Sequence, residues 1–81
     1  KINYNIANAR YRMGKRSINT NPGEAIKFYR QALDYYKRSI ELDSKNINAK
    51  YNHEFVEREL KILLDKLKKQ HSQKTSSGKN K

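Results

Sequence analysis

Residue types that commonly perform catalysis or hold metals are sparse in this sequence. It has no cysteine, and its two histidines, His53 and His71, lie far apart. Glu57 follows His53 by one helical turn, but two groups do not make a metal site. The sequence also lacks a Ser-His-Asp or Cys-His arrangement and a glycine-rich phosphate loop. We therefore expect a protein that is not an enzyme and that uses no metal or cofactor.

Aromatic residues offer a second kind of chemistry, because six tyrosines occur at positions 4, 11, 29, 35, 36 and 51. Beside lysine and arginine, tyrosines suit stacking on the bases of single strands. The helical spacing of these tyrosines instead favours packing between helices, with each hydroxyl at the edge. Phe28 and Tyr35, seven residues apart on one flank, are the candidates for an exposed self-association strip.

The net charge of +11 is unevenly distributed, since residues 66–81 hold six lysines and no acid. Such a charge attracts nucleic acid, anionic lipid or an acidic partner without choosing among them. Residues 70–81 contain no aliphatic or aromatic side chain, which predicts a disordered basic tail. One alternative for the function is therefore a domain that binds nucleic acid or an anionic surface through this tail.

The stretch from Glu24 to Asn46 organises the rest of the chain. Asn21, Pro22 and Glu24 fit an N-cap, a proline at the first helical position and an acid at the third, which predicts a helix over 22–42. A row of small residues on this helix allows a neighbouring helix to approach closely: Ala25, Ala32 and Ser39. The apolar residues are spaced three and four apart along one stripe: Ile26, Tyr29, Leu33, Tyr36 and Ile40.

Helical spacing also covers residues 2–18 and 47–69, on either side of the long helix. The apolar positions at this spacing in the second segment are Tyr51, Phe55, Val56, Leu60, Leu63, Leu64 and Leu67. Gly14 weakens the first of these helices by about 1 kcal/mol relative to alanine, but Ile18 indicates that the helix continues past it. Residues 43–48 form a break in which Ser44 or Asn46 is suited to cap the next helix. The predicted fold is all-α: one domain over residues 1–69, with an antiparallel hairpin of elongated helices and a third, capping helix.

The size of the chain bears on its partners. With 81 residues, of which 35% are hydrophobic, a lone core is marginal, so we expect a homo-oligomer or a piece of a longer array. The first residue, Lys1, also suggests a piece of a longer chain. No apolar run approaches the roughly 20 residues that span a bilayer. Membrane association is therefore expected only through a segment absent from this sequence.

The pair Tyr4-Asn5 recurs 47 residues later as Tyr51-Asn52, and repeated helical pairs are typical of solenoids. The segment NYNIANARYRMGK resembles the first helix of a tetratricopeptide repeat. EAIKFY and YYKRSIELDSKN resemble the second helix, with Ser44 where that family usually has proline, and NAKYNHEFVERELKILLDK resembles the first helix of a following unit. The residues of the first segment near hallmark positions of the family are Ile6, Ala7, Ala9, Tyr11 and Gly14.

A usual repeat of this family has 34 residues, so the 47-residue spacing carries 13 more. We expect both helices of the hairpin to be lengthened, giving about one and a half repeats; the alternative places some of the extra residues in a loop. The last helical segment also resembles repeat proteins of bacterial aerotolerance (Bat-type) operons. That narrower resemblance implies a periplasmic or membrane-associated protein.

The resemblance implies a protein–protein interaction module or scaffold that binds a protein or peptide, or that self-associates. Partners of this family often lie along the surface formed by the first helix of each unit. Asparagine amides there bind a peptide backbone, and arginine or lysine binds a carboxylate. The positions that match in this sequence are Asn5, Asn8, Arg12, Lys50 and Asn52. The alternative is a solvated polar face, and Glu59 weakens the analogy to a site for carboxylates.

Overall fold

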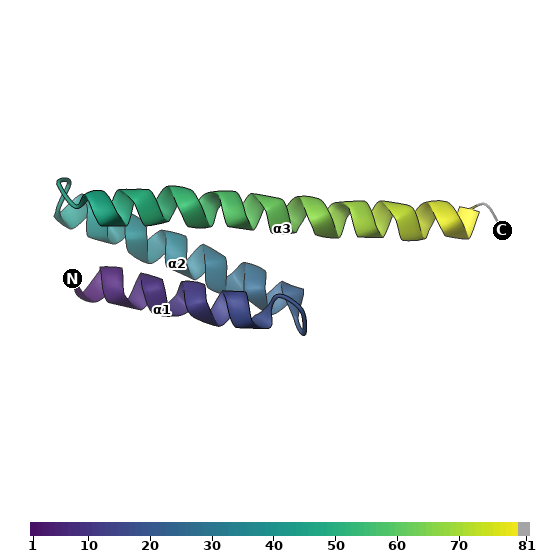
Figure 1. The fold of residues 1–81 in the computed structure, drawn as a ribbon, viewed down its shortest axis with the longest axis horizontal. Coiled ribbons are helices and arrows are strands. Elements are labelled where there is room, and N and C mark those ends of the chain that lie inside the picture. Colours follow the sequence, from purple (N-terminus) through teal and green to yellow (C-terminus); the bar gives the residue numbers. More distant parts are fainter. Residues whose placement is uncertain (80–81) are drawn as a thin grey trace.

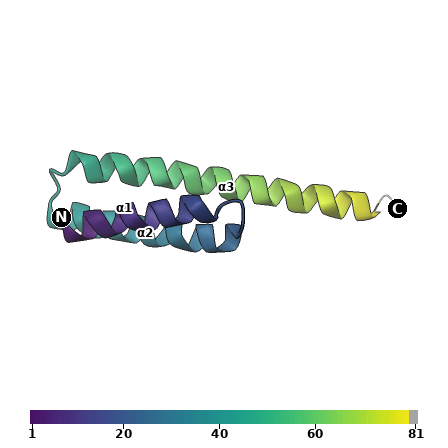
Figure 2. The ribbon, with the colours of Figure 1, turned by 60° about the horizontal axis from the view of Figure 1, so that its bottom comes forward.

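The computed structural model describes residues 1–79, with side chains described for residues 1–72, and confirms the predicted all-α class (Figure 1). Three helices follow one another: α1 (Ile2–Ser17), α2 (Pro22–Leu42) and α3 (Ile47–Lys79). The described part of the chain contains no strand. Helices α1 and α2 form an antiparallel hairpin, and α3 packs along α2 and extends beyond the hairpin (Figure 2).

The start of α2 has the caps that the sequence predicts. The Oδ1 atom of Asn21 accepts a hydrogen bond from the Glu24 backbone N–H at 3.1 Å, and its Nδ2 atom donates to the Glu24 carboxylate at 3.2 Å. Pro22 occupies the first turn, where its missing N–H costs nothing. Helix α3 starts in a similar way, because Asn46 Oδ1 accepts from the Ala49 N–H at 3.0 Å. Of the two predicted caps, Asn46 is therefore the one used.

Small residues bring α1 and α2 close together. Ala25 and Ala32 of α2 are fully buried, and Ser39 is nearly so. On the opposing helix, a Cβ atom added to Gly14 would lie 2.7 Å from Tyr29 Cδ1 and 3.2 Å from the Ala25 carbonyl oxygen. Gly14 is thus buried inside α1, which runs past it to Ser17. Because Gly14 has no side chain, α2 packs directly against the backbone of α1 at this position. Gly14 therefore has a role in packing, in addition to the weak helix propensity that the sequence indicates.

The core is small and rich in aromatic and small side chains. Tyr29 and Tyr36 are the largest fully buried side chains on α2, and Val56 is the largest on α3. Leu60 and Leu63 extend the core along α3. Six partly buried aliphatic and aromatic residues from the predicted helical stripes pack around it: Tyr4, Tyr11, Ile18, Ile26, Leu33 and Leu67.

Helix α3 extends past its predicted end at about residue 69, and its helical backbone continues to Lys79. With 33 residues against 21 in α2, it is longer by 12 residues, or about 18 Å. A helix that is already formed adds each further residue at little cost, because each one brings one more backbone hydrogen bond. The structure therefore has a helix from residue 70 to Lys79, where the sequence predicts a disordered tail over 70–81. Residues 80–81 lie outside the described part.

The connections between helices are short. Residues 18–21 join α1 to α2, and residues 43–46 join α2 to α3. Most of the residues between the pairs Tyr4-Asn5 and Tyr51-Asn52 therefore lie in helices, above all in the 21-residue α2. Long helices with short connections place the N-terminal half of α3 alongside both α1 and α2.

Candidate binding groove

A groove of about 350 Å³ lies between α1 and the N-terminal half of α3, with α2 as its floor. We call it the α1–α3 groove. Its volume is in the range of small ligand sites in proteins. The residues that line it come from all three helices: Asn8, Tyr11, Arg12, Tyr36, Tyr51, Asn52, Phe55 and Val56.

A hydrogen-bond network joins the three helices at one end of this groove. The buried Tyr36 hydroxyl of α2 donates to Asn8 Oδ1 of α1. Asn52 Nδ2 of α3 donates to the same oxygen at 3.2 Å and to the Tyr4 hydroxyl at 3.2 Å. Each asparagine uses only one end of its amide in this network. No hydrogen bond within the described residues engages Asn8 Nδ2 or Asn52 Oδ1.

Burial raises the pKa of Tyr36 to about 12, because a phenolate would be poorly solvated among the helices. The Asn52 side chain and the Arg12 guanidinium both favour the phenolate and lower this pKa in part, whereas Tyr4 and Tyr11 raise it. Arg12 and Tyr36 line the same groove. The tyrosine is therefore a neutral donor at neutral pH, which is the form that the network uses.

Aromatic rings form the rest of the groove wall. Phe55 of α3 meets the ring of Tyr11 of α1 edge to face, with ring centroids 5.9 Å apart. Beneath it, Tyr11 stacks on Tyr29 at 5.5 Å. Tyr51, one turn before Phe55, is 62% exposed, and Phe55 itself is 36% exposed. The groove therefore offers apolar surface beside a polar network.

Two charged residues stand at the groove on α1, and a third lies across from them on α3. Arg12 is exposed and lines the groove, and Lys15 lies over the Tyr11 ring at 6.0 Å. Burial, with a smaller contribution from Glu59 of α3, raises the pKa of Tyr11. Glu59 and Lys15, which have opposite charges, therefore both lie near the Tyr11 ring.

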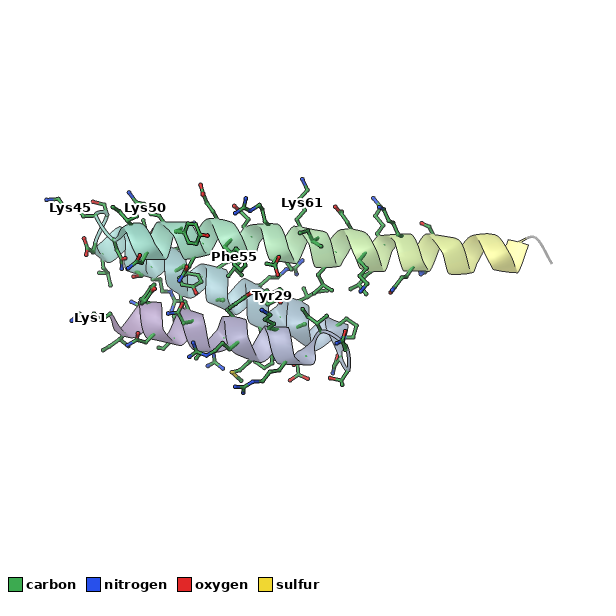
Figure 3. The ribbon with its side chains drawn as sticks, in the orientation of Figure 1. Lys1, Tyr29, Lys45, Lys50, Phe55 and Lys61 are labelled. Carbon is green, nitrogen blue, oxygen red and sulfur yellow. The ribbon has the colours of Figure 1, made fainter. Side chains whose placement is uncertain are left out.

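The structure brings together three of the five partner-binding residues that the sequence predicts. Asn8, Arg12 and Asn52 all line the groove. Asn5 is exposed but does not line it. Lys50 projects from the side of α3 that faces away from α1 (Figure 3). The reason is geometric, because residues two apart on a helix point in nearly opposite directions, so Lys50 and Asn52 cannot share a face.

Five lining residues were not predicted as part of a site: Tyr11, Tyr36, Tyr51, Phe55 and Val56. Sequence spacing assigns Tyr51 and Phe55 to the packed stripe of α3, together with Val56. The structure corrects this, because the buried side of α3 is centred on Val56, and Tyr51 and Phe55 lie on the flank of the helix. The available signal was their spacing, since two aromatic residues four apart lie on one side of a helix.

The predicted self-association strip lies elsewhere, on α2. Phe28 and Tyr35 are both half-buried, and Tyr35 packs against the core. The Arg38 guanidinium lies over the Tyr35 ring, 5.0 Å from its centroid. Neither residue lines the α1–α3 groove. Self-association through this strip stays a prediction.

Among the described residues, no cluster of three histidine, cysteine, aspartate or glutamate side chains is arranged to hold a metal ion. None of the described helices is both long and apolar enough to cross a membrane. Comparison with family models, curated proteins and solved structures found no match to this chain.

Proposed function

We propose that this chain is a helical protein-interaction module that binds an extended peptide segment of another protein in the α1–α3 groove. The observation that carries the proposal is the pair of unused amide groups at the end of the groove. Asn8 Nδ2 is a donor and Asn52 Oδ1 is an acceptor, and the hydrogen bond between the two side chains fixes both. A peptide group offers the complementary pair, one carbonyl oxygen and one N–H.

The aromatic wall supplies the second part of a peptide site. Tyr51 and Phe55 present apolar surface to solvent beside the amides, and the Tyr11 ring holds Phe55 in place. Aromatic side chains are enriched where proteins bind one another, because they bury a large area at a small loss of conformational entropy. An apolar side chain of the peptide would pack there while its backbone meets the amides. The resemblance of the sequence to tetratricopeptide repeats supports the same function.

A selection from a displayed random peptide library, with the whole chain as bait, tests this proposal. Enriched peptides are then synthesised and titrated by calorimetry against the chain and two variants. Tyr51→Ala removes groove wall and should weaken binding by about tenfold, or 1.4 kcal/mol. Ile62→Ala is the matched control, because Ile62 lies on the same helix and is equally exposed at 62%, yet does not line the groove.

The control variant should bind as the parent does. An equal loss in both variants would place the site elsewhere on α3, and no enriched peptide at all would overturn the proposal. Circular dichroism of each variant shows whether the helices are intact. Binding of single-stranded DNA or anionic vesicles, and not of peptides, would instead support the alternative of an anionic-surface domain.

A further inference from the structure

We infer that the end of α3 that projects beyond the hairpin binds duplex DNA, without regard to its base sequence, by contacting phosphates with lysine side chains. The lysines with described side chains in this segment are Lys66, Lys68 and Lys69. We call them the α3 lysine cluster. None of them lines the α1–α3 groove, so this inference is independent of the proposed function.

The first observation is the uneven charge of α3. Its residues 47–65 carry four acidic and three basic side chains, whereas residues 66–79 carry five lysines and no acid. All three members of the α3 lysine cluster are exposed. Among the side chains that the structure describes, no hydrogen bond or ion pair engages any of them, although the last acid, Asp65, directly precedes the cluster. This half of α3 is therefore strongly positive without compensation.

The second observation is that the cluster lies where α3 leaves the hairpin. Lys66 lines a cleft of about 160 Å³ with Ile18 of the α1–α2 connection, and Leu67 is the last described residue of α3 that packs on the core. Arg16, in the last turn of α1, is exposed at this same end of the hairpin. It adds a cation from a second helix. Beyond this point α3 continues alone to Lys79 (Figure 1 and Figure 2).

The shape of the projecting segment suits a groove of DNA. From Lys68 to Lys79, α3 has 12 residues and is about 18 Å long. An α-helix with its side chains is about 10–12 Å wide, and the major groove of B-form DNA, about 12 Å wide, admits one. Because the hairpin does not run alongside this segment, the phosphates of both strands have access to it (Figure 2).

The composition of the segment favours a duplex over other anionic partners. Single strands are bound through aromatic side chains on which bases stack, but residues 66–79 contain no tyrosine, phenylalanine or tryptophan. Helices that lie on anionic membranes insert an apolar face, and the only aliphatic residue of this segment, Leu67, already packs on the core. Lysine, serine, threonine and glutamine, which make up most of the segment, all contact phosphates in protein–DNA complexes.

Fluorescence anisotropy with the whole chain and a labelled DNA duplex of about 20 base pairs, over a range of salt concentrations, tests this inference. We expect the affinity to fall steeply with salt, because each lysine that neutralises a phosphate releases counterions. The variant Lys66→Gln/Lys68→Gln/Lys69→Gln should bind at least about tenfold more weakly at about 50 mM salt. The slope of its log affinity against log salt should be shallower by about 3.

Lys1→Gln/Lys45→Gln/Lys50→Gln is the matched control for the loss of three positive charges. These lysines are exposed and lie at the opposite end of the molecule, which is 56 Å long (Figure 3). This variant should keep the affinity and the salt slope of the parent. Circular dichroism of both variants shows whether the helices are intact.

Three results would overturn the inference. They are the absence of duplex binding at low salt, an equal loss in the two triple variants, and tighter binding of a single strand of the same length or of vesicles of phosphatidylserine and phosphatidylcholine. Because peptide binding in the α1–α3 groove is measured in a separate titration, this inference and the proposed function can fail independently.

Discussion

The two sides of α1 make different kinds of interface. Towards α2, Gly14 and Ala25 allow the backbones to approach closely, and the Tyr29 ring fills the remaining space. Towards α3, the helices stand farther apart, and the Asn8 and Asn52 side chains span the gap. One short helix thus has a closely packed side and a side that leaves a groove. Close packing leaves no room for a ligand, whereas a polar bridge between separated helices leaves a groove.

This comparison also explains the two buried tyrosines of α2. Both rings are almost fully buried, but only the Tyr36 hydroxyl reaches the polar bridge and donates to Asn8. The Tyr29 hydroxyl is also buried, but it has no hydrogen-bond partner within the described residues. Of the two buried tyrosine hydroxyls of α2, one is therefore hydrogen-bonded and the other is not.

The largest expected effect is a loss of stability at alkaline pH. Burial, followed by smaller contributions from neighbouring groups, raises the pKa of Tyr29 and of Tyr36 to about 12, above the ordinary value of about 10. The folded state therefore keeps protons that the unfolded state releases. The stabilisation is complete below pH 10 and is lost between about pH 10 and 12, by about 2–3 kcal/mol for each tyrosine.

Urea unfolding followed by circular dichroism between about pH 9 and 12 measures this loss. The control is the double variant Tyr29→Phe/Tyr36→Phe, which separates the effect of the two buried phenols from any other change at high pH. Its stability should fall much less with pH than that of the parent. Parallel curves for the two proteins would show that the buried phenols do not control the transition.

A smaller effect is expected from closing the space at Gly14. In Gly14→Ala, the new Cβ atom lies too close to the Tyr29 ring, and the overpacking costs about 1–3 kcal/mol. The gain in helix propensity of up to about 1 kcal/mol offsets only part of this cost. Thermal and urea unfolding should therefore show a less stable protein.

Gly23→Ala is the matched control for that substitution. A Cβ atom at Gly23 meets only Asn21 Oδ1, at an ordinary distance of 3.7 Å. This variant should be as stable as the parent or slightly more stable. If Gly14→Ala also stabilised the protein, the close approach of α1 and α2 would not be a constraint.

The smallest expected effects separate the two hydroxyls at neutral pH. Tyr36→Phe removes a donor from the bridge and should destabilise the protein by about 1 kcal/mol. Tyr29→Phe removes a buried hydroxyl that has no partner, so the stability should stay the same or rise slightly. Urea unfolding of both variants measures the difference. A larger loss of stability for Tyr29→Phe than for Tyr36→Phe would contradict the view that only the Tyr36 hydroxyl is hydrogen-bonded.

The sequence by itself determined the three helices and most of their ends, because these depend on local signals. Asn21, Pro22 and Asn46 fix helix starts through their own side chains and backbone restrictions, and periodic apolar residues fix the buried faces. The tertiary structure alone decided which polar residues meet. Asn8 and Asn52 are 44 residues apart in sequence and share a hydrogen bond, whereas Lys50 lies outside the groove.

The reason is that spacing gives the angle of a residue around its own helix, but not the angle and distance between helices. Those depend on the volumes that pack between them, such as the missing side chain at Gly14 and the ring of Tyr29. For the same reason spacing placed Tyr51 and Phe55 in the core, and only the position of α1 decided that they line a groove.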